Sequence, residues 1–167
     1  MIRQATIQDA SAIAQIHIHT WEIAYSGIVP DSHLTALSVE NRTQRWLSTL
    51  SKSLTNTLVY QLDGKLVGWI SLGISRDQDV SEAGEIYAIY VQPEMWGYGI
   101  GKDLMKFGEE QLWQRKVKSI VLWVLEDNFR ARKFYQKGGY TLDGTKKELT
   151  IGEKMLSACR YVKYNDD

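Results

Sequence analysis

The 167-residue sequence predicts a single domain, 1–167, of the α/β or α+β class, with a mixed sheet and helices on both of its faces. Three segments carry this prediction. Asp63 and Gly64 separate two apolar runs, and Asp-Gly readily adopts the positive φ angles of a tight β-hairpin turn. Residues 119–125 are apolar on both faces, as in a central parallel strand. Between them, glycines within 97–101 join a strand to an amphipathic helix.

The amino-terminal third is predicted to form one strand and three helical segments. Residues 2–6 form the strand, and Asp9 or Ser11 caps a helix that Gly27 and Pro30 end. A helical turn follows over 31–37, and a second helix over 39–50. The expected buried stripes are Ile13, Ile16, Thr20, Trp21 and Ala24 on the first helix, and Trp46, Leu47 and Leu50 on the second.

The rest of the chain continues as alternating strands and helices. The hairpin strands cover 58–62 and 66–72, and the acidic segment 76–83 connects them to a strand over 85–91. The glycine junction opens a helix to about residue 115, with Ile100, Leu104, Phe107 and Leu112 as its buried stripe. The strand over 119–125 should lie beside the 85–91 strand. A helix from Asn128 to the glycine pair at 138–139 and a hairpin of strands 140–149 and 155–164 complete the chain.

Charge and cysteine content exclude several classes of partner. Twenty basic and twenty acidic residues cancel, so no nucleic acid or anionic membrane is expected as a partner. The lone Cys159 forms no internal disulfide and is expected to pack in the core. His17, His19 and His33 do not form a metal-ligand set, so no metal is expected. No apolar signal core or window of eighteen apolar residues occurs, and we expect a cytoplasmic protein.

The glycine junction has the features of a phosphate-binding site. Glycines leave room for an anion, and the amide N–H groups at a helix N-terminus attract negative charge. The alternative is a strand-to-helix turn that binds no ligand. The spacing of the glycines matches neither the Walker pattern nor a G-x-G-x-x-G run.

Two motifs together carry a family resemblance. The segment Trp96-Gly97-Tyr98-Gly99-Ile100-Gly101 is followed, about thirty residues later, by Asn128-x-x-Ala131-x-x-Phe134-Tyr135-x-x-x-Gly139-Tyr140. In this order and spacing, the pair resembles the GNAT family of acetyl-CoA-dependent N-acetyltransferases over nearly the whole chain. Trp96 stands where the family usually has Arg or Gln, and Tyr140 replaces the commoner Phe. The resemblance implies a mostly antiparallel sheet in which the central parallel strands splay apart.

The resemblance also implies a site for acetyl-CoA. The pyrophosphate would bind the glycine-junction amides, and the pantetheine arm would pair with the strand backbone at 89–91 as an added strand. Lys102 either reaches the phosphates or is a solvated helix lysine. Asn128 either contacts the pantetheine or serves only as a helix cap. The residues assigned to the cofactor are Ile89, Tyr90, Val91, Trp96, Gly97, Tyr98, Gly99, Ile100, Gly101, Lys102, Asn128, Ala131 and Tyr135.

Two side chains are candidates for proton transfer. An alkylamine has a pKa near ~10.4, so acetylation requires that its proton be removed. Glu85 is the candidate base, since strand alternation places it on one face with Tyr87, Ile89 and Val91; the alternative is a charged residue at an exposed strand end. Tyr135 matches the family tyrosine that protonates the departing thiolate, and a buried packing tyrosine is the alternative.

The acceptor is expected between the amino-terminal helices and the later loops. The candidate residues are Trp21, Glu22, Tyr25, Trp46 and Tyr87, although core packing alone also accounts for Trp21. Aromatic walls with carboxylates nearby suit a cationic amine. Apolar aromatics on the terminal hairpin, such as Tyr161 and Tyr164, are expected to contribute to a homodimer interface, as the resemblance implies.

The resemblance therefore implies an N-acetyltransferase that transfers acetyl from acetyl-CoA to a primary amine, by direct attack in a ternary complex. One alternative is a protein acetyltransferase that modifies lysine or the N-terminus and has an open groove. Another is a regulatory module that binds acyl-CoA without turnover.

Overall fold

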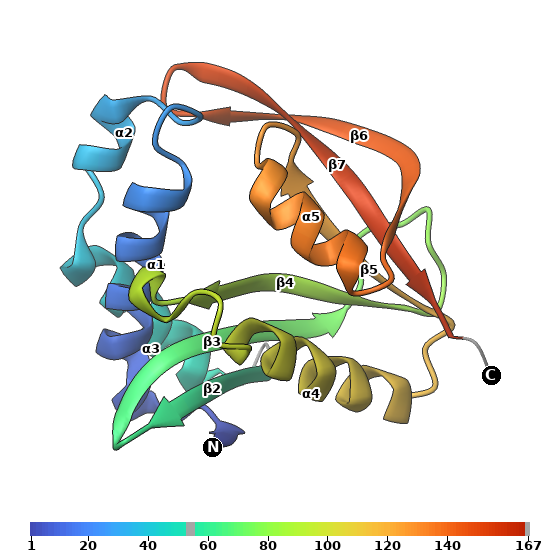
Figure 1. Cartoon of the computed structure of the whole chain (residues 1–167), viewed down its shortest axis with the longest axis horizontal. Helices are drawn as coiled ribbons and strands as arrows, with labels where there is room; N and C mark the ends of the chain where they lie inside the picture. Colours follow the sequence, from blue (N-terminus) through green and yellow to red (C-terminus); the bar gives the residue numbers. More distant parts are fainter. Residues whose placement is uncertain (53–55, 166–167) are drawn as a thin grey trace.

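The computed structural model describes residues 1–52 and 56–165 and shows helices packed on a seven-stranded mixed sheet of order β1-β2-β3-β4-β5-β7-β6 (Figure 1). The strands are β1 (Ile2–Gln4), β2 (Asn56–Leu62), β3 (Lys65–Ile74), β4 (Ala83–Val91), β5 (Ser119–Leu125), β6 (Thr141–Ile151) and β7 (Lys154–Tyr164). The helices are α1 (Ala10–Ala24), α2 (Asp31–Thr35), α3 (Val39–Ser51), α4 (Ile100–Gln114) and α5 (Phe129–Lys137), with short 3-10 turns at Ile7–Asp9 and Pro93–Met95. The predicted fold class and element order are confirmed.

The β2–β3 turn has the predicted geometry. Asp63 and Gly64 both have positive φ angles, 48° and 78°, as a primed two-residue turn requires. Asp9, by contrast, makes no side-chain cap to α1; its carboxylate accepts hydrogen bonds from Arg3 and from the Thr6 backbone.

The central strands β4 and β5 are parallel and hydrogen-bonded only at one end. Residues 83–86 of β4 pair with 119–122 of β5, and beyond these the strands separate. All other neighbouring strands in the sheet are antiparallel. The predicted splay is therefore confirmed, and it leaves the later part of β4 without a partner on its β5 side.

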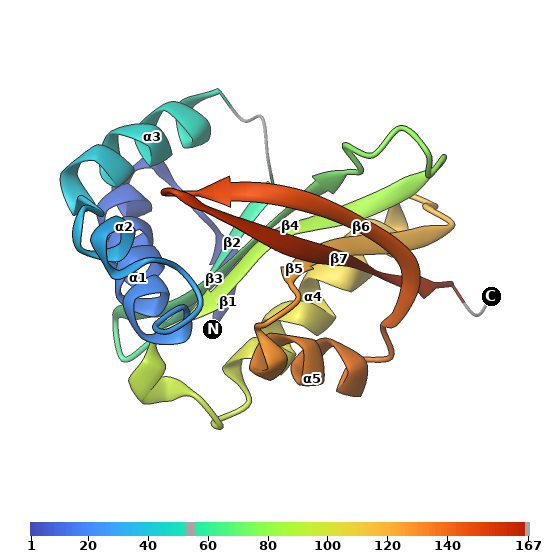
Figure 2. The ribbon, with the colours of Figure 1, turned by 90° about the horizontal axis from the view of Figure 1, so that it is seen from above.

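The helices cover the two faces of the sheet as separate layers (Figure 2). α1 and α3 pack on one face through Ile13, Ile16 and Trp46, which form a buried cluster with Trp69 of β3. α4 packs on the opposite face, and α5 lies beside it near β5 and β7. The tip of the β6–β7 hairpin reaches across to α2, where Leu34 packs with Leu156.

Two sequence-based expectations about burial are wrong. Phe107 is 39% exposed, and Gly108 takes its place in the buried stripe of α4. The helix approaches β3 so closely there that a Cβ at Gly108 would lie 2.9 Å from Leu72. Tyr161 is fully buried, and its hydroxyl accepts hydrogen bonds from Arg132 and Gln136, so it does not contribute to an interface. Tyr164 is exposed, and the homodimer stays a prediction.

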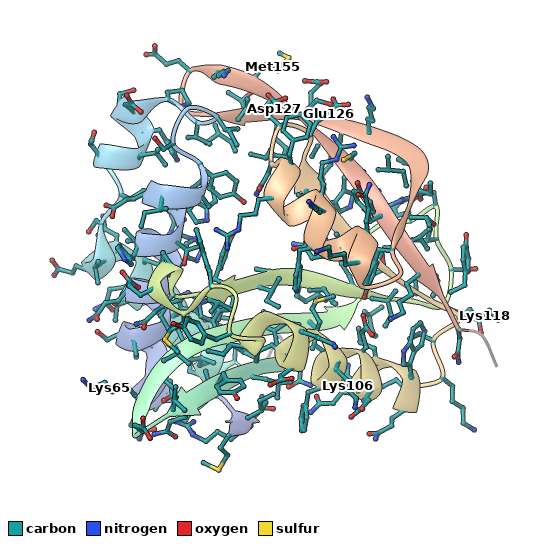
Figure 3. All side chains as sticks on the ribbon, in the orientation of Figure 1. Lys65, Lys106, Lys118, Glu126, Asp127 and Met155 are labelled. Atoms are coloured by element: carbon teal, nitrogen blue, oxygen red, sulfur yellow. The ribbon has the colours of Figure 1, made fainter. Side chains whose placement is uncertain are left out.

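None of the described helices is long and apolar enough to cross a membrane. Lysines lie well apart on the surface: Lys65 is at the β2–β3 turn, Lys106 is on α4, and Lys118 is at the start of β5 (Figure 3).

Candidate active site

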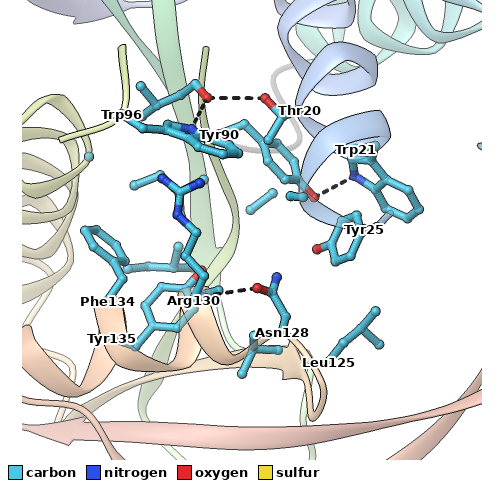
Figure 4. A pocket seen from close by; sticks show the side chains of 18 of the residues that line it. Thr20, Trp21, Tyr25, Tyr90, Trp96, Leu125, Asn128, Arg130, Phe134 and Tyr135 are labelled. Carbon is cyan, nitrogen blue, oxygen red and sulfur yellow. Dashed lines mark hydrogen bonds between the residues drawn. The ribbon is translucent and has the colours of Figure 1, made fainter. Parts of the chain in front are cut away.

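The splay between β4 and β5 opens into a cavity of about 520 Å³ (Figure 4). Its walls come from α1, β4, the glycine junction, α5, β5 and the terminal hairpin. Most residues predicted for the cofactor and acceptor line it together: Trp21, Tyr25, Tyr87, Ile89, Tyr90, Val91, Trp96, Gly97, Gly99, Ile100, Gly101, Lys102, Asn128, Ala131 and Tyr135. Four predicted residues do not line it: Glu22, Trp46, Glu85 and Tyr98.

The glycine junction forms one wall of the cavity and ends at the N-terminus of α4. Gly97 and Gly99 have φ angles of +90° and +86°, which residues with a Cβ adopt only at a cost. A Cβ at either position would meet no protein atom within 4 Å. Gly99 is the N-cap of α4, and the first amides of a helix lack acceptors within the helix. The junction therefore offers donors and open space, as an anion site requires.

Trp96 has a structural role that the sequence did not reveal. Its indole N–H donates to the Val91 carbonyl over 2.8 Å, which ties the junction to the end of β4. The guanidinium of Arg130 lies 3.2 Å from the centre of its ring (Figure 4). Trp96 stands where the motif usually has Arg or Gln, and its contact with Arg130 brings a cation from α5 to the same wall. Arg130 also lines the cavity. The sequence gives one signal for this role, the position of Arg130 two residues after the Asn128 cap.

Asn128 and Tyr135 project from the two ends of α5. The Asn128 side-chain oxygen accepts a hydrogen bond from the Ala131 amide at 3.2 Å, so its role as a helix cap is confirmed. Tyr135 makes ring contacts with Phe134, Tyr140 and Tyr161. Burial, and after it the nearby Tyr25, raises the pKa of the Tyr135 phenol well above its usual value. The phenol is therefore protonated at neutral pH and can donate into the cavity.

Glu85 does not lie where strand alternation predicts. Ser71 pairs with Ala88, but the next β3 residue, Leu72, pairs with Ile86, so Tyr87 forms a bulge. The bulge breaks the alternation, and Glu85 does not share a face with Ile89 and Val91. Its side chain is almost fully buried, and its carboxylate accepts hydrogen bonds from the Arg76 amide and guanidinium, the shortest of them 2.6 Å.

The acceptor end of the cavity is aromatic. The Trp21 indole N–H donates to the Tyr90 hydroxyl at 2.9 Å, and the Trp21 ring meets that of Tyr25 edge to face. Glu22 is exposed on the far side of α1, and Trp46 lies behind this wall against Trp69.

The opposite side of this end contains Trp123, which the sequence analysis missed. Its indole N–H donates to Asp77 at 2.8 Å. Arg160 bonds the same Asp77 as well as Asp79 and Asp143, so the segment between β3 and β4 is held against the terminal hairpin. The contacts of Asp77 and Asp79 with Trp123 and Arg160 join residues more than forty positions apart, and no local pattern in the sequence indicates them.

Comparisons of sequence and of structure relate the chain to known acetyltransferases. The profile of the acetyltransferase (GNAT) family matches residues 14–140. The uncharacterised N-acetyltransferase YuaI of Bacillus subtilis is 31% identical, and the match covers 95% of each chain. A spermidine N(1)-acetyltransferase of Thermoplasma acidophilum is 25% identical over 92% of this chain and 95% of its own. The crystal structure of the PaiA N-acetyltransferase of T. acidophilum in complex with coenzyme A has a similar fold, with a TM-score of 0.81, 22% identity, and coverage of 99% of this chain and 98% of that one.

Proposed function

The chain belongs to the acetyltransferase (GNAT) family and is an N-acetyltransferase that uses acetyl-CoA; from this premise we propose that it acetylates a small primary amine by direct attack in a ternary complex. The observation that carries the proposal is the cavity between the splayed strands. It has the glycine junction, the candidate anion site, at one end and the aromatic wall at the other. Acetyl-CoA and the acceptor amine can thus meet within one cavity.

Direct attack is supported by the position of the only cysteine. Cys159 is 2% exposed, and its thiol points to the Val124 carbonyl over 3.6 Å. Burial raises the pKa of that thiol, which makes the nucleophilic thiolate scarce. Cys159 does not line the cavity, so a covalent acetyl-enzyme through it is disfavoured.

In the proposed reaction, the amine nitrogen attacks the thioester carbonyl and the CoA thiolate departs. The β4 edge from Ile89 onward lacks a strand partner on its β5 side, so its amides are candidates to pair with the pantetheine and to polarise the carbonyl. The protonated Tyr135 phenol donates to the departing sulfur. The amine proton leaves through water, because the paired and buried Glu85 has no direct path to the cavity.

The contact between the terminal hairpin and the α1–α2 region favours a small amine over a protein as the acceptor. Lys154 of the terminal hairpin donates to the Ile28 carbonyl at 3.0 Å, and a Cβ at Gly152 would lie 3.2 Å from His33. The hairpin tip is therefore in contact with the α1–α2 region. A protein acetyltransferase, which must admit a lysine or an N-terminus on a folded partner, would require an open groove here.

The test is an acceptor screen with acetyl-CoA, in which free thiol release is followed. Primary amines, spermidine, and peptides with a free N-terminus or a lysine are compared at equal concentration. We expect turnover of one or more small amines and little turnover of peptides. Turnover of peptides alone would favour the protein acetyltransferase, and CoA binding without any release would fit the regulatory module.

A further inference from the structure

A second cavity of about 380 Å³ lies next to the first. It is bounded by α1, α3, β3 and the bulged part of β4. Tyr87 and Ala88 line both cavities, so the second cavity adjoins the acceptor end of the first. Its lining residues are His17, Trp46, Thr49, Trp69, Ser71, Arg76, Tyr87 and Ala88.

Two rings in this lining have buried polar atoms without partners. His17 is 8% exposed and Trp69 is 1% exposed, and neither the His17 ring nitrogens nor the Trp69 indole nitrogen makes a hydrogen bond within the described chain. The rings lie 5.8 Å apart, centre to centre. Burial, and after it the charge of Arg42, lowers the pKa of His17 to about 3, so the ring is neutral and has one N–H. Each ring therefore supplies one N–H donor that lacks an acceptor, which is rare for buried groups.

The charge around this cavity is positive. Arg42 lies on the same stripe of α3 as Trp46 and Thr49, which line the cavity, and precedes Trp46 by one helical turn. Arg42 is partly buried and makes no ion pair in the part of the chain that the structure describes. Arg76 lines the cavity too, but Glu85 neutralises it. No carboxylate lines the second cavity within the described residues.

We propose that the second cavity binds a carboxylate group of the acceptor, so that the substrate is an amine that also carries a carboxylate. This inference rests on the proposed function. A carboxylate only accepts hydrogen bonds, so it matches the two unpartnered N–H donors and the Arg42 charge. A cationic group of the acceptor would lie near the positive charge of Arg42, and no unpaired carboxylate among the described lining residues would offset the repulsion. The cationic acceptor expected from the sequence depended on Glu22 and Glu85, of which one is exposed and the other paired.

The test compares matched amines with and without a carboxylate, 6-aminohexanoate against hexylamine and phenylalanine against phenethylamine. Turnover is measured as kcat/KM, and binding is measured separately without acetyl-CoA by saturation-transfer NMR. We expect the carboxylates to be preferred by about 10-fold or more, since a hydrogen bond to a charged group is worth about that factor. Arg42→Gln should remove the preference, and Arg42→Lys should restore part of it.

Arg45→Gln is the matched control, because it removes the same charge from an exposed position on the same helix. It should leave the preference intact, whereas equal losses in both variants would indicate long-range electrostatics and overturn the carboxylate site. Equal binding of the two members of each pair, or a preference that persists in Arg42→Gln, would also overturn it. If no amine is acetylated, the proposed function fails, but the NMR comparison still decides whether a carboxylate binds through Arg42.

Discussion

At the scale of single residues, Tyr135 is the side chain whose removal should separate chemistry from binding. Tyr135→Phe keeps the ring contacts with Phe134 and Tyr140 but deletes the proton donor. We expect unchanged CoA affinity and a kcat lower by about 10²-fold, measured by thiol release and by calorimetric titration with CoA. Tyr140→Phe is the control, since that hydroxyl is buried, makes no hydrogen bond within residues 1–52 and 56–165, and lies outside the cavity. A similar loss in both variants would contradict the assignment.

For Glu85, a structural role and a catalytic role predict different effects of the same substitution. If Glu85 mainly holds Arg76, Glu85→Gln should lower the free energy of unfolding by about 1–2 kcal/mol and reduce kcat/KM by a factor that does not vary with pH. A base that removes the amine proton would instead give the largest loss at low pH, and the loss would shrink toward the amine pKa of about 10.4. Denaturant unfolding and pH–rate profiles of the variant distinguish the two roles.

At the scale of elements, the turn before α4 should couple backbone conformation to cofactor binding. Gly99→Val places a β-branched residue at a φ of +86°, which should cost about 1–2 kcal/mol of stability, and puts a side chain where the phosphates are expected. Gly144→Val is a close control, because Gly144 has a φ of +89° and equally open surroundings but lies outside the cavity. Both variants should lose stability, and only Gly99→Val should lose CoA affinity. Equal CoA affinity in folded Gly99→Val would refute the phosphate site.

The elements that the sequence predicted correctly are those specified by local patterns. The Asp63-Gly64 turn and the Asn128 cap depend on neighbours within a few residues, and the structure contains both. The bulge at Tyr87 depends instead on the register with β3 and could not be predicted from alternation. For the same reason, the Trp96–Arg130 contact and the second cavity were missed, since each joins segments that only the folded chain brings together.

At the scale of the whole molecule, the cavities depend on contacts between distant segments. The sheet divides where β4 and β5 separate, and Arg160 ties the β3–β4 segment to the terminal hairpin on the far side of that division. The hairpin tip in turn contacts the α1–α2 region. These links hold the walls of the first cavity in place while their strands lack mutual hydrogen bonds. Burial of His17 behind one of these walls also makes the global stability depend on pH.

His17 should make the protein less stable as the pH falls below 6.5. Its pKa is about 3 in the folded chain, against 6.5 for an unburied histidine, so between these values the unfolded chain binds one more proton. The stabilisation is complete above pH 6.5 and is lost as the pH falls toward 3. Between pH 6.5 and 5, unfolding by denaturant without acceptor should show a loss of about 2 kcal/mol. Carboxylates with lowered pKa values, such as Asp9 and Asp79, titrate below this range. His17→Gln should flatten the slope, whereas His19→Gln, at an exposed position on the same helix, should keep it. A slope that persists in His17→Gln would show that the buried imidazole is not its source.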